Sequence, residues 1–196
     1  MDRLAGVVRG QAGLARALWW AVRGRTAVAP GDVALPYDGL DRAVIWTITA
    51  VGMVETVVVH VLVSWPPTRW SLLVLSVYGV LGLLAFAATM RQHPHVVRGT
   101  DLVLRSGHFR TVRVPLGEVA SVRRNVRNEH AKTLEVADDG LALSFMGGTT
   151  VELRFPPAAS VEVDGRPHTV ERVSFAAHDP AAAVSLLRTR VAGAER

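Results

Sequence analysis

The sequence contains no cysteine, and this absence removes a whole class of chemistry. Disulfide bonds, thiolate metal sites and cysteine nucleophiles are all excluded. Other enzyme signatures are missing as well, since there is no phosphate-binding loop, no G-x-S-x-G and no H-E-x-x-H. Gly147-Gly148 fits a turn, and Asp179 beside His178 fits a helix cap rather than a catalytic group. We therefore expect no catalytic residues, no resident metal and no cofactor.

Charge is scarce in two long apolar blocks, residues 43–65 and 70–90. Each block is long enough to cross a hydrocarbon core of about 30 Å at about 1.5 Å per residue. Arginines bracket the blocks, and tryptophans lie near their ends, where amphipathic rings favour the membrane interface. The sequence therefore predicts two transmembrane helices within residues 42–91, joined by a tight turn at 66–69. The alternative, a buried helical hairpin in a soluble protein, lacks a remaining chain large enough to cover both helices.

Arginine is abundant before the first block and after the second, whereas the connecting turn holds only Arg69. Positive charge close to membrane spans is retained on the cytoplasmic side. Both termini are therefore expected to be cytoplasmic, in a multi-pass protein of the cell (cytoplasmic) membrane. A cleaved signal peptide is not expected, because arginines interrupt the apolar part of residues 1–25.

Residues 1–25 are predicted to form a basic amphipathic helix in the plane of the membrane. Apolar side chains gather on one side of this helix, and Arg9, Arg16 and Arg23 repeat every seven residues beside them. The alternative is a helix packed on the protein's own domain, or a frayed tail, because several glycines weaken the helix. Residues 26–41 are rich in Pro, Gly and Asp and are predicted to be a linker.

After residue 90 the pattern changes to short strands separated by turn signals. The expected strands are residues 102–105, 108–114, 118–124, 132–137, 141–146, 149–155, 160–163 and 168–176. This spacing is typical of an antiparallel all-β domain. Asp179 then fits an N-cap, Pro180 fits the first helical position, and Val184, Leu187 and Val191 make an apolar stripe. The predicted fold class is therefore an α+β membrane protein, with a β domain that ends in a helix.

This outline resembles a pleckstrin-homology-like (PH-like) barrel, in which antiparallel strands are closed by a C-terminal helix. The stretch GTDLVLRSGHFRTVRVPLGEVASVRR resembles the opening of bacterial PH-like domains found beside membrane helices, with matches at Leu102, Leu104, Gly107, Val114, Pro115, Leu116, Val119 and Val122. The layout of residues 43–190 is also similar to uncharacterised actinobacterial two-span integral membrane proteins, in which counterparts of Glu55, His60 and His178-Asp179-Pro180 recur. The resemblance implies a transmembrane hairpin followed by a PH-like domain over residues 95–192, and it implies no activity.

Glu55 and His60 stand inside the first apolar block, where an ionised acid near the bilayer centre costs at least about 2.5–3.5 kcal/mol. A protonated carboxyl that donates a hydrogen bond avoids most of this cost. Five residues along a helix turn the two side chains about 140° apart, so a close pair is not expected. Partners for Glu55 are expected on the second block, where Tyr78 and Ser76 are the polar side chains in reach, or on a second copy of the protein.

Two interpretations of this pair remain open. A ridge of small residues, on which helices can approach closely, is formed by Ser76, Gly79, Gly82, Ala85 and Ala88. It favours a structural role, in which Glu55 joins helices or copies of the protein. The alternative is a proton, ion or metal path from Glu55 and His60 towards His93 and His95. Against it, no third ligand has convergent spacing, and two helices are too few for a conduit without oligomerisation.

Arginines are frequent around the first hairpin of the β domain and the strand after it, at Arg105, Arg110, Arg113, Arg123 and Arg124. Such side chains suit contacts with anionic lipid headgroups, each worth about 1 kcal/mol near a membrane surface. The alternative is a positive cytoplasmic surface without specificity. Nucleic acid is not an expected partner, because no recognition helix or aromatic platform accompanies the charge.

Together these features predict a membrane-anchored PH-like binding or scaffold module at the cytoplasmic face. Its expected partners are the lipid bilayer, anionic headgroups, and a second copy or another membrane protein. The alternative function is an oligomeric intramembrane proton, ion or metal site built on Glu55 and His60.

Overall fold

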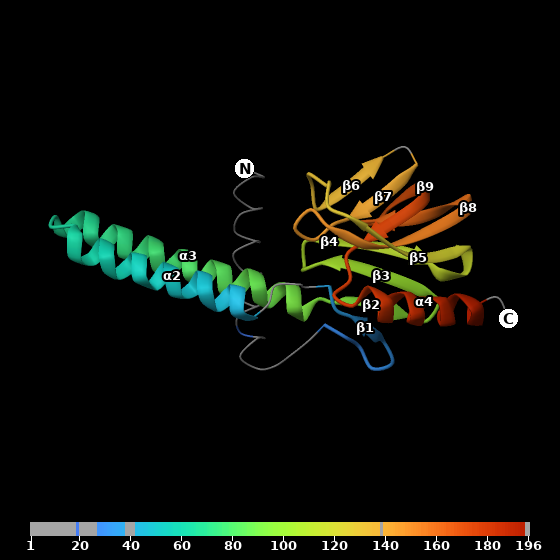
Figure 1. Ribbon diagram of the computed structural model, residues 1–196, viewed down its shortest axis with the longest axis horizontal. Helices are drawn as coiled ribbons and strands as arrows, with labels where there is room; N and C mark the ends of the chain where they lie inside the picture. Colours follow the sequence, from blue (N-terminus) through green and yellow to red (C-terminus); the bar gives the residue numbers. More distant parts are fainter. Residues whose placement is uncertain (1–18, 20–26, 38–41, 138, 195–196) are drawn as a thin grey trace. The chain divides into compact units, whose positions relative to one another are not determined.

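The computed structural model describes residues 19, 27–37, 42–137 and 139–194. The predicted amphipathic helix, with Arg9, Arg16 and Arg23, lies outside these residues. The chain divides into two compact units (Figure 1). The helical unit contains α2 (Arg42–Leu62) and α3 (Pro66–Gln92), and the β unit contains the strands and α4 (Pro180–Ala194). The predicted α+β class is confirmed.

Helices α2 and α3 pack side by side and antiparallel (Figure 1). The ring of His60 meets that of Trp70 near the connection, and Gly52 approaches Val80 further away from it. The predicted turn at 66–69 is wrong, because the connection is residues 63–65 and Pro66 begins α3. Proline fits there because the first turn of a helix leaves its N–H groups without intrahelical partners.

A close approach between the helices occurs at Gly52 of α2, and not at Gly79 or Gly82 of the predicted ridge on α3. A Cβ atom added to Gly52 would lie 3.3 Å from Val80 Cγ2. Added to Gly79 or Gly82, it would meet no described atom within 4 Å. The two glycines of the ridge therefore face away from α2. Because the helices are antiparallel, the contact at Gly52 also brings Glu55 level with residues near Val77.

The β unit forms one mixed sheet of nine strands. The strands are β1 (Val33–Leu35), β2 (His95–Arg98), β3 (Asp101–Ser106), β4 (Arg110–Pro115), β5 (Ser121–Arg127), β6 (Leu134–Ala137), β7 (Gly140–Leu143), β8 (Thr149–Val163) and β9 (Arg166–Phe175). Their order is β1-β2-β3-β4-β8-β9-β7-β6, with β5 paired to β8. The prediction of a purely antiparallel domain is wrong at one place, because β7 and β9 are parallel.

Part of the predicted linker is a strand. Residues 33–35 form β1, which pairs with β2, the first strand after α3. The side chain of Asp32, just before β1, is bound by Arg98 at the end of β2, at 2.7 Å. A run of three residues is too short to show strand periodicity, so only its pairing with β2 reveals it.

A single long strand, β8, replaces the two strands predicted at 149–155 and 160–163. Its first half pairs with β5 and its end pairs with β4, while β9 follows it along both halves. The β8–β9 register shifts between Arg154 and Ala159, in the stretch that contains Pro156 and Pro157. Proline cannot donate a ladder hydrogen bond and is accommodated at such an irregularity. The β8–β9 hairpin thus connects the part of the sheet that contains β1 to β4 with the part that contains β7 and β6.

The core of the β unit is built from alternate residues of β3, β4, β8 and β9, and α4 packs against it. Asp179 Oδ1 accepts hydrogen bonds from the N–H groups of Ala181 and Ala182, each at 3.0 Å. Leu187 is fully buried and Val184 nearly so. The predicted C-terminal helix, its cap and its apolar stripe are therefore confirmed. The short 3₁₀ helix Leu116–Glu118 links β4 to β5 beside α4.

Candidate functional site

The polar residues of the helical unit are not gathered into one site. Glu55 is exposed on α2, and within the described residues no hydrogen bond joins it to Tyr78 or Ser76. The ring of His60 lies edge-on to that of Trp70, with the centroids 6.3 Å apart. No group of three metal-ligating side chains occurs in the part of the chain that the structure describes. The predicted partner for Glu55 on α3 is therefore not seen.

His95 cannot serve the predicted path, because both of its ring nitrogens are occupied. Nδ1 accepts the N–H of Arg105 at 2.9 Å, and Nε2 lies 3.0 Å from the carbonyl of Ala176. This pattern requires a neutral ring protonated on Nε2. Burial lowers the pKa of His95 to about 3, and the ring stacks on Tyr37 with the centroids 4.3 Å apart. His95 therefore joins β2, β3 and the end of β9.

The arginines of the first hairpin bind groups within the β unit. Arg110 donates to Asp164 at 2.7 Å, and Arg113 lies 3.9 Å from Glu162. The guanidinium of Arg105 donates to the carbonyl of Ala27 at 2.8 Å, and its burial lowers its pKa. These three predicted lipid contacts are thus partly satisfied by the protein itself. Arg124 is exposed and forms no ion pair with a described residue.

Arg123, a further predicted lipid contact, belongs to a cluster centred on Glu152 of β8. Glu152 is fully buried, and its Oε1 accepts hydrogen bonds from Arg123 Nη2 at 2.6 Å and Arg154 Nε at 2.7 Å. Its Oε2 accepts from Asn125 Nδ2 at 2.6 Å. Burial alone would raise the pKa of Glu152, but hydrogen bonds from Arg154, Asn125 and Arg123 outweigh it and lower the pKa to about 2. The carboxylate is therefore ionised and holds two arginines on the sheet.

A second network that the sequence did not reveal connects His130, Glu135 and Thr149. His130 Nδ1 lies 2.9 Å from Glu135 Oε2, and His130 Nε2 lies 3.4 Å from Thr149 Oγ1. The hydrogen bond from His130 is the main cause that lowers the pKa of Glu135. Thr149, His130 and Glu135 are thus arranged like the nucleophile, the base and the orienting acid of a catalytic triad. However, Thr149 is fully buried, so its hydroxyl is closed to substrate, and the network holds the loop before β6.

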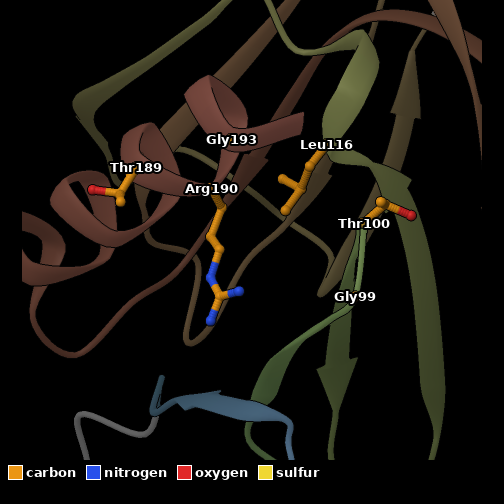
Figure 2. A pocket seen from close by; sticks show the side chains of 6 residues that line it. All are labelled: Gly99, Thr100, Leu116, Thr189, Arg190 and Gly193. Atoms are coloured by element: carbon orange, nitrogen blue, oxygen red, sulfur yellow. The ribbon is translucent and has the colours of Figure 1, made fainter. Parts of the chain in front are cut away.

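Figure 2 shows a hollow of about 340 Å³ beside α4, lined by Gly99, Thr100, Leu116, Thr189, Arg190 and Gly193. Arg190 extends from α4 into the space in front of Gly99 (Figure 2). The side chains of Thr100 and Thr189 point to opposite sides, and the Thr189 hydroxyl donates to the carbonyl of Ser185. One cation without converging polar groups does not make a specific small-molecule site.

A second hollow, of about 400 Å³, lies by the start of β5 and is lined by Ala120, Ser121, Asp139, Arg154, Phe155, Pro156, Glu171 and Arg172. Its charges balance, since two arginines face two acids, and Arg172 binds Asp139 at 2.8 Å. Neither hollow gathers groups for catalysis.

No family model, curated protein or solved structure matches this chain.

Proposed function

We propose that this protein is a membrane-anchored binding or scaffold module. In this proposal α2 and α3 cross the cytoplasmic membrane as a hairpin, both termini are cytoplasmic, and the β unit binds at the inner face. The observation that carries the proposal is the exposed apolar surface of the helical unit. Large side chains such as Val61, Val74 and Leu75 are 65–75% exposed. An exposed apolar surface of this kind marks a membrane or protein interaction site.

The length of α3 supports this proposal, and that of α2 fits it when the residues before Trp46 are included. Helix α3 is long and apolar enough to cross a membrane, and only 17% of its most apolar window is buried. The described apolar stretch of α2, Trp46–Leu62, is shorter than the length that α3 reaches. In the sequence the apolar residues begin at Ala43, and a helix over 43–62 would rise about 30 Å, the thickness of a hydrocarbon core. Two crossings joined by the connection at 63–65 therefore fit one bilayer.

For the β unit we propose a PH-like domain. The β3–β4 hairpin, the Pro115-Leu116 pair and the helix α4 packed on the core support it. The parallel pairing of β7 with β9 departs from the all-antiparallel pattern. The proposed ligands are anionic headgroups and a partner protein, because the exposed cations, such as Arg124 and Arg190, lie on open surfaces.

The topology can be tested directly because the chain has no cysteine. We would place single cysteines at Ser64, in the connection between the spans, and at Thr169, on an exposed position of β9. In intact bacterial cells, a membrane-impermeant maleimide should label the Ser64→Cys protein at once. The Thr169→Cys protein should be labelled only after lysis. Labelling of Thr169→Cys in intact cells would exclude a cytoplasmic β unit.

A second candidate function rests on Glu55. Its carboxyl is exposed on the apolar surface of α2 without a described partner. An ionisable group in such a place marks a candidate site for proton or ion movement. In that case Glu55 and His60 would act in an oligomer, since two helices enclose no conduit.

A further inference from the structure

Three strands of the sheet pair with only one other strand among the described residues: β1, β5 and β6. The longest of them is β5, with seven residues against three in β1 and four in β6. An edge strand presents N–H and C=O groups that no ladder uses, and proteins usually keep such edges short or covered. The free edge of β5 is therefore where another chain could pair most extensively with the sheet.

A contact from α4 shows which groups of β5 point to the free edge. Arg188 donates to the carbonyl of Val122 through Nε at 3.1 Å and through Nη2 at 3.0 Å. This carbonyl thus points away from β8. The N–H and C=O of one residue point to the same side of an extended strand, and successive residues alternate. The N–H of Val122 and both backbone groups of Arg124 therefore also point to the free edge.

A third hollow, of about 330 Å³, lies at this edge between β5 and α4. Its described lining comes from the start of β5 and from one side of α4: Ala120, Ser121, Val122, Arg188, Val191 and Ala192. Helix α4 contacts β5 without closing this space, and its volume is in the range of ligand sites. We call it the edge groove. An extended chain placed there would have backbone groups of β5 on one side and α4 on the other.

The charges of the edge groove are not balanced. Its described lining contains the cation of Arg188 and no acid. The guanidinium of Arg188 contacts a backbone carbonyl and forms no ion pair with a described residue. Arg124, on the same face of β5 as Val122, is exposed and also lacks such an ion pair. On the opposite face, Arg123 is bound by Glu152. The unbalanced charge therefore favours a ligand that brings carboxylates.

Exposed apolar surface also lies on β5. Four large apolar side chains of the described β unit are exposed, at Phe109, Val126, Val136 and Met146. Met146 is 82% exposed, but it stands in a turn with a φ angle of +50°, in the left-handed region, and offers no strand to pair with. Val126 is 53% exposed and lies on β5 itself. A strand added at the free edge would place side chains beside Val126, and covering it would be favourable.

We propose that the edge groove binds an extended acidic segment of a partner protein, which pairs with β5 as an added strand. An N–H group of the segment replaces Arg188 at the carbonyl of Val122, and Arg188 then binds a carboxylate of the segment. A hydrogen bond between two charged groups is stronger than one to a neutral carbonyl, so this exchange favours binding. The inference deepens the proposed binding function and rests on it for the partner protein, but it does not depend on the membrane anchoring.

The test uses the full chain in detergent and a phage-displayed library of random peptides as the probe. We expect the selection to enrich peptides that alternate apolar residues with Asp or Glu. A fluorescein-labelled copy of an enriched peptide should bind Arg188→Glu at least about tenfold more weakly than wild type, because a hydrogen bond between charged groups is lost. Replacing the acids of the peptide with Lys should abolish binding to wild type and restore binding to Arg188→Glu.

Arg124→Pro tests the strand pairing separately from the charge. Proline removes the N–H that faces the free edge and leaves the ladder with β8 in place, since proline is tolerated on the open side of an edge strand. Peptide binding should be lost in Arg124→Pro. The matched control is Arg124→Ala, which removes the same cation, keeps the N–H and should retain most of the binding. Equal circular dichroism of the two variants would show that both are folded.

Three outcomes would overturn the proposal. The selection could enrich no sequence, the charge-reversed peptide could fail to bind Arg188→Glu, or Arg124→Pro could bind as well as Arg124→Ala. Light scattering without peptide tests a second copy as the occupant, since a lower mass for Arg124→Pro than for Arg124→Ala would assign the edge to self-association instead. None of these results bears on the labelling of Ser64→Cys and Thr169→Cys, so failure of the edge groove is distinguished from failure of the membrane anchoring.

Discussion

At the scale of single residues, the β unit keeps buried polar groups by giving each of them several partners. Glu152 accepts hydrogen bonds from three side chains, and His95 uses both ring nitrogens. A buried charge without such partners would cost several kcal/mol, on the order of 3–5 when one member of a pair is removed. These residues therefore stabilise the sheet.

Replacing Glu152 with Gln should destabilise the β unit by about 2–4 kcal/mol at pH 7, because Arg123 and Arg154 lose their carboxylate. The pKa of Glu152 is lowered from 4.5 to about 2 on folding. Its contribution is thus present above pH 4.5 and is lost as the pH falls towards 2. Urea unfolding followed by circular dichroism should show a difference between wild type and Glu152→Gln that shrinks over this interval.

The matched control is Glu162→Gln, since Glu162 is exposed and lies 3.9 Å from Arg113. Exposed pairs of this kind contribute roughly 0–1 kcal/mol. Equal losses in the two variants, or a Glu152→Gln difference that does not depend on pH, would show that the buried cluster does not stabilise the sheet.

At the scale of elements, the helical hairpin packs along one face of α2 and includes a close contact at Gly52. The less exposed positions of α2, at Thr49, Gly52, Thr56 and Val59, recur three or four residues apart. This spacing is that of a helix face packed against a neighbour. The glycines of α3 at 79 and 82 face open space and contribute nothing to this contact.

Gly52→Leu should push the helices apart, because even its Cβ would lie 3.3 Å from Val80 Cγ2. Overpacking of this kind costs about 1–3 kcal/mol. Thermal loss of helical circular dichroism in detergent should begin at a lower temperature than in wild type. Gly79→Leu is the control and should leave the midpoint unchanged or raise it, since it meets open space. A hairpin that tolerates both substitutions equally would contradict the packing at Gly52.

At the scale of the whole molecule, the exposed carboxyl of Glu55 decides between a scaffold and an intramembrane site. A protonated Glu55 and a Gln are nearly isosteric and both donate a hydrogen bond, whereas Leu cannot. If a second copy supplies the missing partner, the assembly depends on this donor. A role in proton transfer instead requires the acid itself.

Light scattering of wild type, Glu55→Gln and Glu55→Leu in detergent tests this point. We expect wild type and Glu55→Gln to be oligomers and Glu55→Leu to be a monomer, because Leu cannot donate the hydrogen bond that is proposed to join the copies. The same size for all three proteins would exclude this role. Glu55 would then be the leading candidate for proton or ion movement.

The local features of this protein follow from the sequence itself. The apolar blocks predict the helices, the Ser106-Gly107 signal predicts the β3–β4 hairpin, and Asp179-Pro180 predicts the start of α4. Each depends on residues close together in the chain, where periodicity and turn chemistry act. The predicted ends of helices and strands differ from the observed ends by a few residues, because a local signal can fit two structures. Pro66, for example, can begin a helix as readily as it can form a turn.

Only the tertiary structure decides which distant residues meet. The pairing of β1 with β2, the parallel pairing of β7 with β9 and the cluster around Glu152 join segments that are separated by other elements of the chain. Tyr37 likewise contacts two distant turns, at Gly107 and at Phe145. In the sequence, Glu152 was one polar residue in an alternating strand and Met146 one residue before a glycine turn. Their burial, strain and exposure arise from packing between segments, which no local pattern encodes.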